Sequence, residues 1–130
     1  MVRIIVGGQM EKARIADLVR KLGGERVEVQ VKSDLEAAMS VKRGEADCYF
    51  GCCATGGGGS LAGAIAILGY GQCVSVSMPG IAPDRNKIEQ AVAEGKKAFG
   101  FTDGHVDSAV ALLMEVLLKR EAALKNPSAE

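Results

Sequence analysis

Short apolar, β-prone runs alternate along this chain with segments of helical periodicity. The apolar runs cover residues 3–6, 26–31, 46–53, 73–78 and 98–101. The first helical segment has apolar residues at positions 15, 18, 19 and 22, and the others cover residues 34–43, 61–68, 85–94 and 106–125. Parallel strands need crossover connections, which helices commonly provide. The alternation therefore predicts an α/β fold: a three-layer αβα sandwich around a five-stranded, mostly parallel sheet, Rossmann-like or flavodoxin-like.

The length of 130 residues fits one domain of ordinary size. We expect a single α/β domain over residues 1–126 and a frayed tail at 127–130. The first residues lack the charged, apolar and cleavage regions of a secretory signal. No apolar run reaches the ~18 residues of a membrane span. These features predict a cytoplasmic protein.

Charge and aromatic content argue against a nucleic-acid partner. The chain carries 16 basic and 16 acidic residues, and aromatic residues make up only 4% of it. A chain of zero formal charge lacks the basic excess that attracts phosphate backbones, and few rings are available to stack on bases. We therefore expect no nucleic-acid partner.

Four cysteines cluster in the middle of the chain, but their spacing does not indicate a metal site. Cys48 and Cys52 lie in one apolar run, and Cys73 begins another. The sequence contains neither a Cys-x-x-Cys pair nor the Cys/His spacing of a zinc site. We expect no metal and no cofactor, and we interpret Cys48 and Cys73 as reduced core residues.

In sheets of this class, ligands bind outside the carboxyl ends of the strands, where the strand order reverses. The candidate loops at that edge are residues 7–9, 33–34, 52–60, 78–85 and 102–105. The strongest candidate is the turn after the third strand, where four consecutive glycines follow Thr55. Glycines leave backbone N–H groups free to converge on an anion, and the following helix adds its positive dipole end.

A tight turn that only lets a strand and a helix pack closely is the alternative to this anion site. Four glycines exceed what one tight turn needs, so we favour the anion site. The predicted ligand-binding residues are Gly8, Gln9, Thr55, Gly56, Gly57, Gly58, Gly59, Ser60 and His105. Neither a Walker loop nor a good dinucleotide fingerprint is present, so the turn does not indicate a nucleotide.

Residues 44–62 resemble the central motif of the ribose-5-phosphate isomerase B family, which pairs a cysteine with a Thr-Gly-x-Gly-x-Ser turn. The resemblance implies that Cys53 is a catalytic base. It also implies an anion hole for an enediolate intermediate, formed by Thr55, Gly56, Gly58 and Ser60.

The chain departs from those isomerases at two other places. Gln9 and Met10 stand where the isomerases carry an Asp-His pair after the first strand. Residues 78–80, Met-Pro-Gly, stand where they carry a histidine after the fourth strand. The usual residues for ring opening and phosphate binding are thus replaced.

Across nearly its whole length the chain is similar to the YhfU family of small bacterial proteins. The matching stretches are residues 34–39, 53–60, 79–81, 94–96, 99–100 and 105–106. Members of this family tend to be encoded beside a polytopic membrane transporter and metabolic enzymes. The resemblance therefore implies a soluble partner or sensor of a transporter.

Single residues at the predicted edge have two interpretations each. Cys53 is either a thiolate activated at a helix N-terminus or a small core residue. His105, the single histidine, either faces the glycine turn or caps and packs its own helix. We expect Asp34 to cap its helix rather than bind a ligand. Gln9 either binds a ligand or holds its own loop, and Arg85 is either a countercharge or simply solvated.

The last helical segment has an apolar stripe at Val110, Leu113 and Leu117, which we expect in the core. Met114 and Leu118 lie beside this stripe. We expect these two residues to extend into a subunit contact, which favours a homo-oligomer.

Three functions are consistent with these observations. The favoured one is a binding or regulatory protein for a small anionic metabolite, a phosphate or a carboxylate, because it needs no catalytic base. The second is an isomerase-like enzyme that acts on a sugar phosphate or a related hydroxy-carbonyl compound, with Cys53 as base. The third is a structural oligomer without a ligand.

Overall fold

The computed structural model describes residues 1–54 and 58–125, with the backbone alone for residues 58–60. The strands are β1 (Val2–Gly8), β2 (Val27–Val31), β3 (Cys48–Cys53), β4 (Cys73–Ser75) and β5 (Ala98–Thr102). The helices are α1 (Lys12–Gly23), α2 (Asp34–Lys42), α3 (Gly58–Leu68), α4 (Arg85–Ala93) and α5 (Val106–Lys125). The predicted frayed tail lies outside the described residues.

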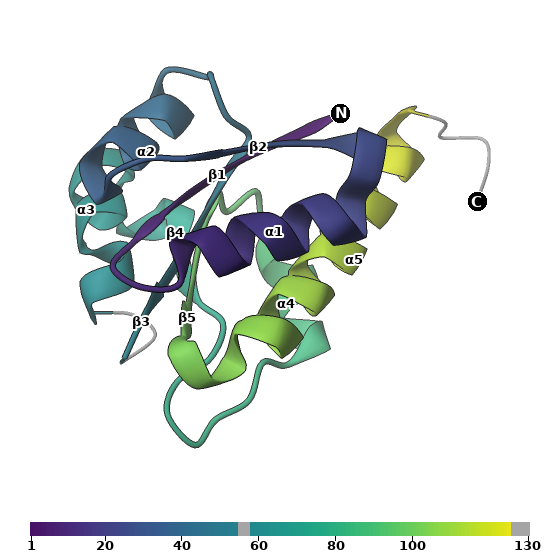
Figure 1. The fold of residues 1–130 in the computed structure, drawn as a ribbon. Coiled ribbons are helices and arrows are strands. Elements are labelled where there is room, and N and C mark those ends of the chain that lie inside the picture. Colours follow the sequence, from purple (N-terminus) through teal and green to yellow (C-terminus); the bar gives the residue numbers. More distant parts are fainter. Residues whose placement is uncertain (55–57, 126–130) are drawn as a thin grey trace.

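The five strands form one parallel sheet in the order β2-β1-β3-β5-β4. Helices α2 and α3 cover one face, and α1, α4 and α5 cover the other (Figure 1). This arrangement confirms the predicted α/β three-layer sandwich. The edge position of β2 agrees with its alternating, half-exposed residues.

Alternate side chains of each strand enter two separate cores, as the pleat requires. The larger core lies under α1, α4 and α5, where Phe50 meets the rings of Phe99 and Phe101 edge to face. The smaller core lies under α2 and α3 and is built around Ile5, Tyr49 and small residues.

The C-terminal helix differs from its prediction at two positions. Met114 and Leu118, expected in a subunit contact, are only 2% and 8% exposed and belong to the larger core. The prediction was wrong because the buried stripe of α5 is wider than three residues: α5 packs against both α1 and α4.

Strand β4 ends at Ser75, three residues earlier than predicted. The N–H of Val76 still donates to the carbonyl of Gly100. Beyond that point the N–H of Thr102 donates to the side-chain Oγ of Ser77, 3.0 Å away, instead of to a β4 carbonyl. The backbone hydrogen bonds between β4 and β5 stop here because the Ser77 side chain, and not a β4 carbonyl, accepts from Thr102.

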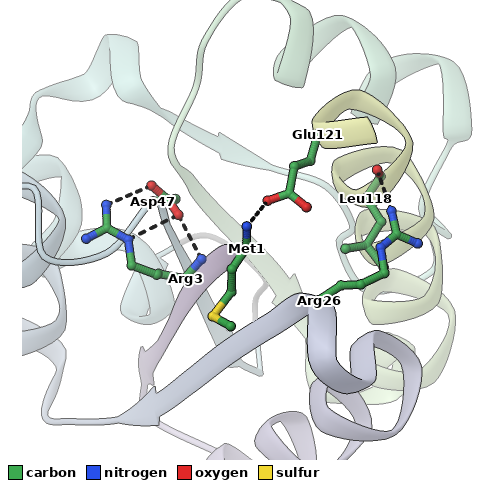
Figure 2. A network of polar contacts seen from close by, with 6 residues as sticks. All are labelled: Met1, Arg3, Arg26, Asp47, Leu118 and Glu121. Atoms are coloured by element: carbon green, nitrogen blue, oxygen red, sulfur yellow. Dashed lines mark hydrogen bonds and ion pairs between the residues drawn. The ribbon is translucent and has the colours of Figure 1, made fainter. Parts of the chain in front are cut away.

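Polar contacts hold the amino ends of the strands together (Figure 2). Arg3 binds Asp47 through its backbone N–H and its guanidinium, at 2.7 and 3.0 Å. The amino group of Met1 lies 2.7 Å from Glu121, and Arg26 donates to the carbonyl of Leu118 at 2.9 Å. These contacts link β1 to the start of β3 and link the starts of β1 and β2 to α5.

Candidate functional site at the carboxyl edge of the sheet

The strand order reverses between β1 and β3, because the chain leaves β1 for β2 on one side and returns to β3 on the other (Figure 1). Gly8, Cys53 and Thr102 end the three central strands at the carboxyl edge. This is the edge where ligands bind in sheets of this kind. The described parts of the loops predicted to share an edge therefore do so, since all five strands are parallel.

The loop after β1 is tied to β3 by its backbone. The N–H groups of Gln9 and Met10 both donate to the carbonyl of Cys52, at 3.1 and 3.2 Å. Gly8 has a φ of +78°, and a Cβ there would lie 2.7 Å from the Cys52 nitrogen, so this position requires glycine. Since its backbone holds the loop, the exposed side chain of Gln9 is available to a ligand.

Three glycines lie in register across the central strands just below this edge. Gly7 of β1 is opposite Gly51 of β3, and Gly51 is opposite Gly100 of β5. The three residues are buried. Neighbouring groups can therefore approach the backbone of the sheet closely along this row.

Tyr49 covers the Gly7 end of that row. A Cβ at Gly7 would lie 2.6 Å from a ring carbon of Tyr49 and 2.9 Å from the Cβ of Ala37. The hydroxyl of Tyr49 donates to Oδ1 of Asp34. Burial, that hydrogen bond and the Asp34 charge all raise the pKa of Tyr49, while the N–H of Gly8 acts in the opposite direction.

Asp34 is not the helix cap that we expected. Ser33 caps α2, because its hydroxyl accepts from the N–H of Glu36 at 3.3 Å. Asp34 is the first helical residue, and its carboxylate binds Tyr49 and also approaches Gly63 of α3. The sequence alone offered one clue to the role of Tyr49: a polar hydroxyl within an apolar strand.

Cys53 and Thr102 are opposite each other in register on β3 and β5. Cys52 and Phe101, which precede them, enter the larger core, so Cys53 and Thr102 face the α2/α3 side. Cys53 and Thr102 are each 3% exposed. The pair places a thiol and a hydroxyl side by side at the edge.

His105 joins this group through Thr102. It lies in the 3-10 turn Asp103–His105 between β5 and α5, and its Nδ1 is 2.7 Å from Oγ1 of Thr102. Oγ of Ser77 is 3.5 Å from that same Oγ1, and the hydroxyl of Ser75 donates to the carbonyl of Ser77. The sequence analysis did not identify Ser77 as a site residue. The only hint was that serines occupy every second position after Cys73, at 75 and 77, which places both on one face of the predicted strand.

All four cysteines are buried, and none of them forms a disulfide. Burial raises the pKa of Cys48, and it raises that of Cys52, which lies in the larger core, to about 12. It also raises the pKa of Cys73, although Lys96 opposes the effect, and this thiol donates to the carbonyl of Gly69. These three residues are core cysteines, as predicted for Cys48 and Cys73.

The predicted glycine turn is described only in part. Thr55, Gly56 and Gly57 lie outside the described residues. Gly58, Gly59 and Ser60 form the first turn of α3, which begins three residues before the predicted start at Leu61. Since α3 follows β3 directly, its N-terminal N–H groups and positive dipole end lie at the carboxyl edge.

Two charged residues near this edge, Arg85 and Asp107, are paired with other parts of the protein. Arg85 pairs with Glu115 of α5 at 2.7 Å, which favours the structural interpretation over a ligand countercharge. Asp107 pairs with Arg14 of α1, also at 2.7 Å. The negative charge of Asp107 is therefore offset within the protein.

The described residues contain neither a cluster that could hold a metal ion nor a helix that could span a membrane. No group of three or more His, Cys, Asp or Glu side chains there could hold a metal ion. Among the same residues, no helix combines the length and apolar character needed to cross a membrane.

Comparisons with known proteins place the chain in a family. The family described as "Protein of unknown function DUF2620" matches residues 2–117. The proteins described as "Uncharacterized protein YhfU" from Escherichia coli strain K12 and from Shigella flexneri are each 38% identical to it over 117 residues. The alignments cover 90% of this chain and 99% of each relative. No solved structure matches the chain. The chain therefore belongs to the DUF2620 family and is a YhfU-like protein, as its sequence resemblance predicted.

Proposed function

We propose that this protein binds a small anionic metabolite, a phosphate or a carboxylate, at the carboxyl edge of the sheet. The observation that carries the proposal is the convergence of Gly8, Cys53 and Thr102 with the first turn of α3 at the reversal of strand order. A helix N-terminus offers unpaired N–H groups and partial positive charge. Those are the groups that an anion requires.

Side chains of this edge support an anionic ligand. Gln9 is exposed and His105 is half-buried, and both can donate hydrogen bonds from opposite sides of the Cys53 strand end. The glycine run of the sequence adds backbone donors without side chains that would obstruct them. Arg85 and Asp107 are already paired within the protein and play no part in the proposal.

Ligand-induced stabilisation tests this function. Inorganic phosphate, ribose 5-phosphate and citrate are added in turn, and the thermal midpoint is measured. A ligand that binds the folded state raises stability by about 2.7 kcal/mol at 100 times its Kd. We expect at least one of these anions to raise the midpoint in a saturable way.

Two variants and one matched control locate the binding. Gln9→Ala and His105→Ala remove donors at the carboxyl edge and are expected to weaken binding. Gln30→Ala changes a glutamine that is also exposed but lies on the edge strand β2, away from the reversal point. An equal loss in all three variants, or no midpoint shift with any anion, would remove the support for this function.

A second candidate function is favoured by the register of Cys53 opposite Thr102 on neighbouring strands. Thr102 binds His105, so one residue links the thiol position to an imidazole. An isomerase-like enzyme would use Cys53 as a base that removes a proton next to the carbonyl of a sugar phosphate. The N-terminus of α3 would stabilise the enediolate that forms.

The enzyme and the binding protein differ in one measurement. In D₂O, an enzyme exchanges the proton next to the carbonyl of ribose 5-phosphate, which proton NMR detects. Cys53→Ser should then abolish exchange and leave affinity nearly unchanged. Binding without exchange in the unaltered protein would exclude this second candidate for that substrate.

A further inference from the structure

We propose that Ser77 and Thr102 are positioning residues that fix the tautomer of neutral His105, with the ring hydrogen on Nε2. In this state His105 is a hydrogen-bond donor and not a base at the edge where we propose that an anion binds. The donor role toward a ligand rests on the proposed function. The state of the ring in the free protein does not.

The positioning group is buried and joined by short contacts. Ser77 and Thr102 are 2% and 3% exposed, and they come from chain segments 25 residues apart. The N–H of Thr102 donates to Oγ of Ser77 at 3.0 Å. Thr102 Oγ1 lies 2.7 Å from Nδ1 of His105, the shortest contact of the group.

The hydrogen atoms can be assigned along this chain of contacts. Oγ of Ser77 already accepts the Thr102 N–H, so its own hydrogen needs an acceptor in a buried place. Oγ1 of Thr102 lies 3.5 Å away, and we assign it as the acceptor of this hydrogen. The hydrogen of Thr102 is then available to Nδ1 of His105, which must accept it. A neutral imidazole that accepts at Nδ1 carries its hydrogen on Nε2.

The position of Ser77 is itself secured. The hydroxyl of Ser75 donates to the carbonyl of Ser77 at 3.1 Å, and the N–H of Val76 donates to Gly100. The segment that follows β4 therefore fixes the first turn after β5. Ser75 and Ser77 thus hold the backbone around Thr102 through their hydroxyl groups, which core packing alone would not require.

A hydrogen on Nε2 of His105 limits both the ligands that the ring can bind and the role that it can play in a reaction. A donor at Nε2 requires an acceptor atom, such as a phosphate, carboxylate or carbonyl oxygen. In the second candidate function, His105 would polarise a carbonyl oxygen while Cys53 removes the proton. Neutral histidine acts in this electrophilic way in other isomerase chemistry.

NMR of the ring nitrogens tests the assignment directly, because the chain contains a single histidine. Long-range ¹H–¹⁵N spectra of the ligand-free protein are recorded where the ring is neutral. We expect Nδ1 to have the shift of an unprotonated nitrogen and Nε2 that of a protonated one, with little averaging. A hydrogen on Nδ1, or the averaged shifts of free imidazole, would overturn the proposal.

Variants of Thr102 and Ser77 distinguish a role in fixing the His105 tautomer from a general role in stabilising the fold. Thr102→Val removes the hydroxyl at similar volume, whereas Thr102→Ser keeps it. We expect the tautomers to mix in the first variant and the wild-type shifts to persist in the second. Ser77→Ala supplies an independent test if Thr102→Val does not fold, and mixing is again expected. Unchanged ring shifts in a folded Thr102→Val or Ser77→Ala variant would contradict the role of that residue.

Added inorganic phosphate and acetate test the ligand contact separately. We expect either anion to move the Nε2 shift of the wild type. Affinity should be about twofold lower in Thr102→Val than in Thr102→Ser, because a ring with mixed tautomers presents its Nε2 hydrogen for only about half of the time. A fixed tautomer that neither anion perturbs would contradict the donor role at the proposed site. The positioning role of Ser77 and Thr102 would stand in that case.

Discussion

The hydroxyl of Tyr49 donates to the carboxylate of Asp34 and so joins the centre of the sheet to the start of α2. Tyr49 has no exposed surface, and its ring lies against Gly7. The carboxylate of Asp34 also approaches Gly63 of α3. One hydrogen bond thus joins β3 to α2, and its acceptor also lies against α3.

Replacing Tyr49 by phenylalanine should destabilise the fold by about 1–3 kcal/mol, because buried hydrogen-bonding groups lose a partner while the ring packing remains. Urea unfolding measures the change. Tyr70→Phe is the matched control, since Tyr70 is 79% exposed. Its stability should change by less than about 0.5 kcal/mol, and an equal effect in the two variants would contradict the role of the Asp34 bond.

Gly7→Ala should destabilise the protein by about 1–3 kcal/mol. The added Cβ would overlap the Tyr49 ring, which burial and the Asp34 bond prevent from moving away. Gly71→Ala is the control, because a Cβ there would meet no atom within 4 Å. Denaturant midpoints compare them, and we expect Gly71→Ala to be neutral or slightly stabilising. Similar losses in both variants would exclude the steric explanation.

The stability that Asp47 contributes should disappear in acid. Partial burial raises the pKa of Asp47, but hydrogen bonds from the side chain and backbone of Arg3 outweigh burial and lower it. A depressed folded-state pKa gives stability that is present above the unfolded value of about 3.9 and is lost as pH falls through the folded value.

The difference in unfolding free energy between the wild type and Asp47→Asn should therefore be constant above about pH 5 and shrink below about pH 4. Asp17→Asn, at a side chain that is 79% exposed, is the control and should leave the pH profile nearly unchanged. A wild-type advantage that grows in acid would show that the sign of this coupling is wrong.

The four thiols should react with a disulfide reagent at pH 8 only after the protein unfolds. All four are buried, and burial raises the pKa of Cys48 and Cys52, so few thiolates are present. Absorbance of the released thiol follows the reaction with and without denaturant. Ser108→Cys, at an exposed position, should react at once and serves as the control. A fast native reaction that Cys53→Ser removes would instead favour the enzyme candidate.

Much of the fold followed from periodicity. The spacing of Ile15 and Val19 marked α1, and the polar alternation of residues 27–31 marked an edge strand. The sequence did not predict that β5 lies between β3 and β4, because local patterns do not encode which strand pairs with which. The sequence did contain a hint. The serines after Cys73 are typical of an edge strand, and the mostly apolar residues of β5 are typical of a central one, which is buried throughout.

For the candidate site, the sequence predicted which loops lie at the carboxyl edge, but not the side-chain contacts within them. The positions of Gly8, Cys53 and His105 at strand ends followed from the parallel topology. The bond of Tyr49 to Asp34 did not, because it joins residues that only the packing of α2 on the sheet brings together. The contact of Thr102 with His105 is local, but it depends on the 3-10 turn Asp103–His105, which the apolar periodicity did not predict.

The place of β5 between β3 and β4 has a consequence for synthesis. Strand β3 pairs with β1 on one side and with β5 on the other, and β4 pairs with β5. While the ribosome makes the first 97 residues, the fully buried strand Cys48–Cys53 keeps an open edge, and β4 has no neighbour to join. A nascent chain halted before Ala98 would present that edge to other chains and be prone to aggregate.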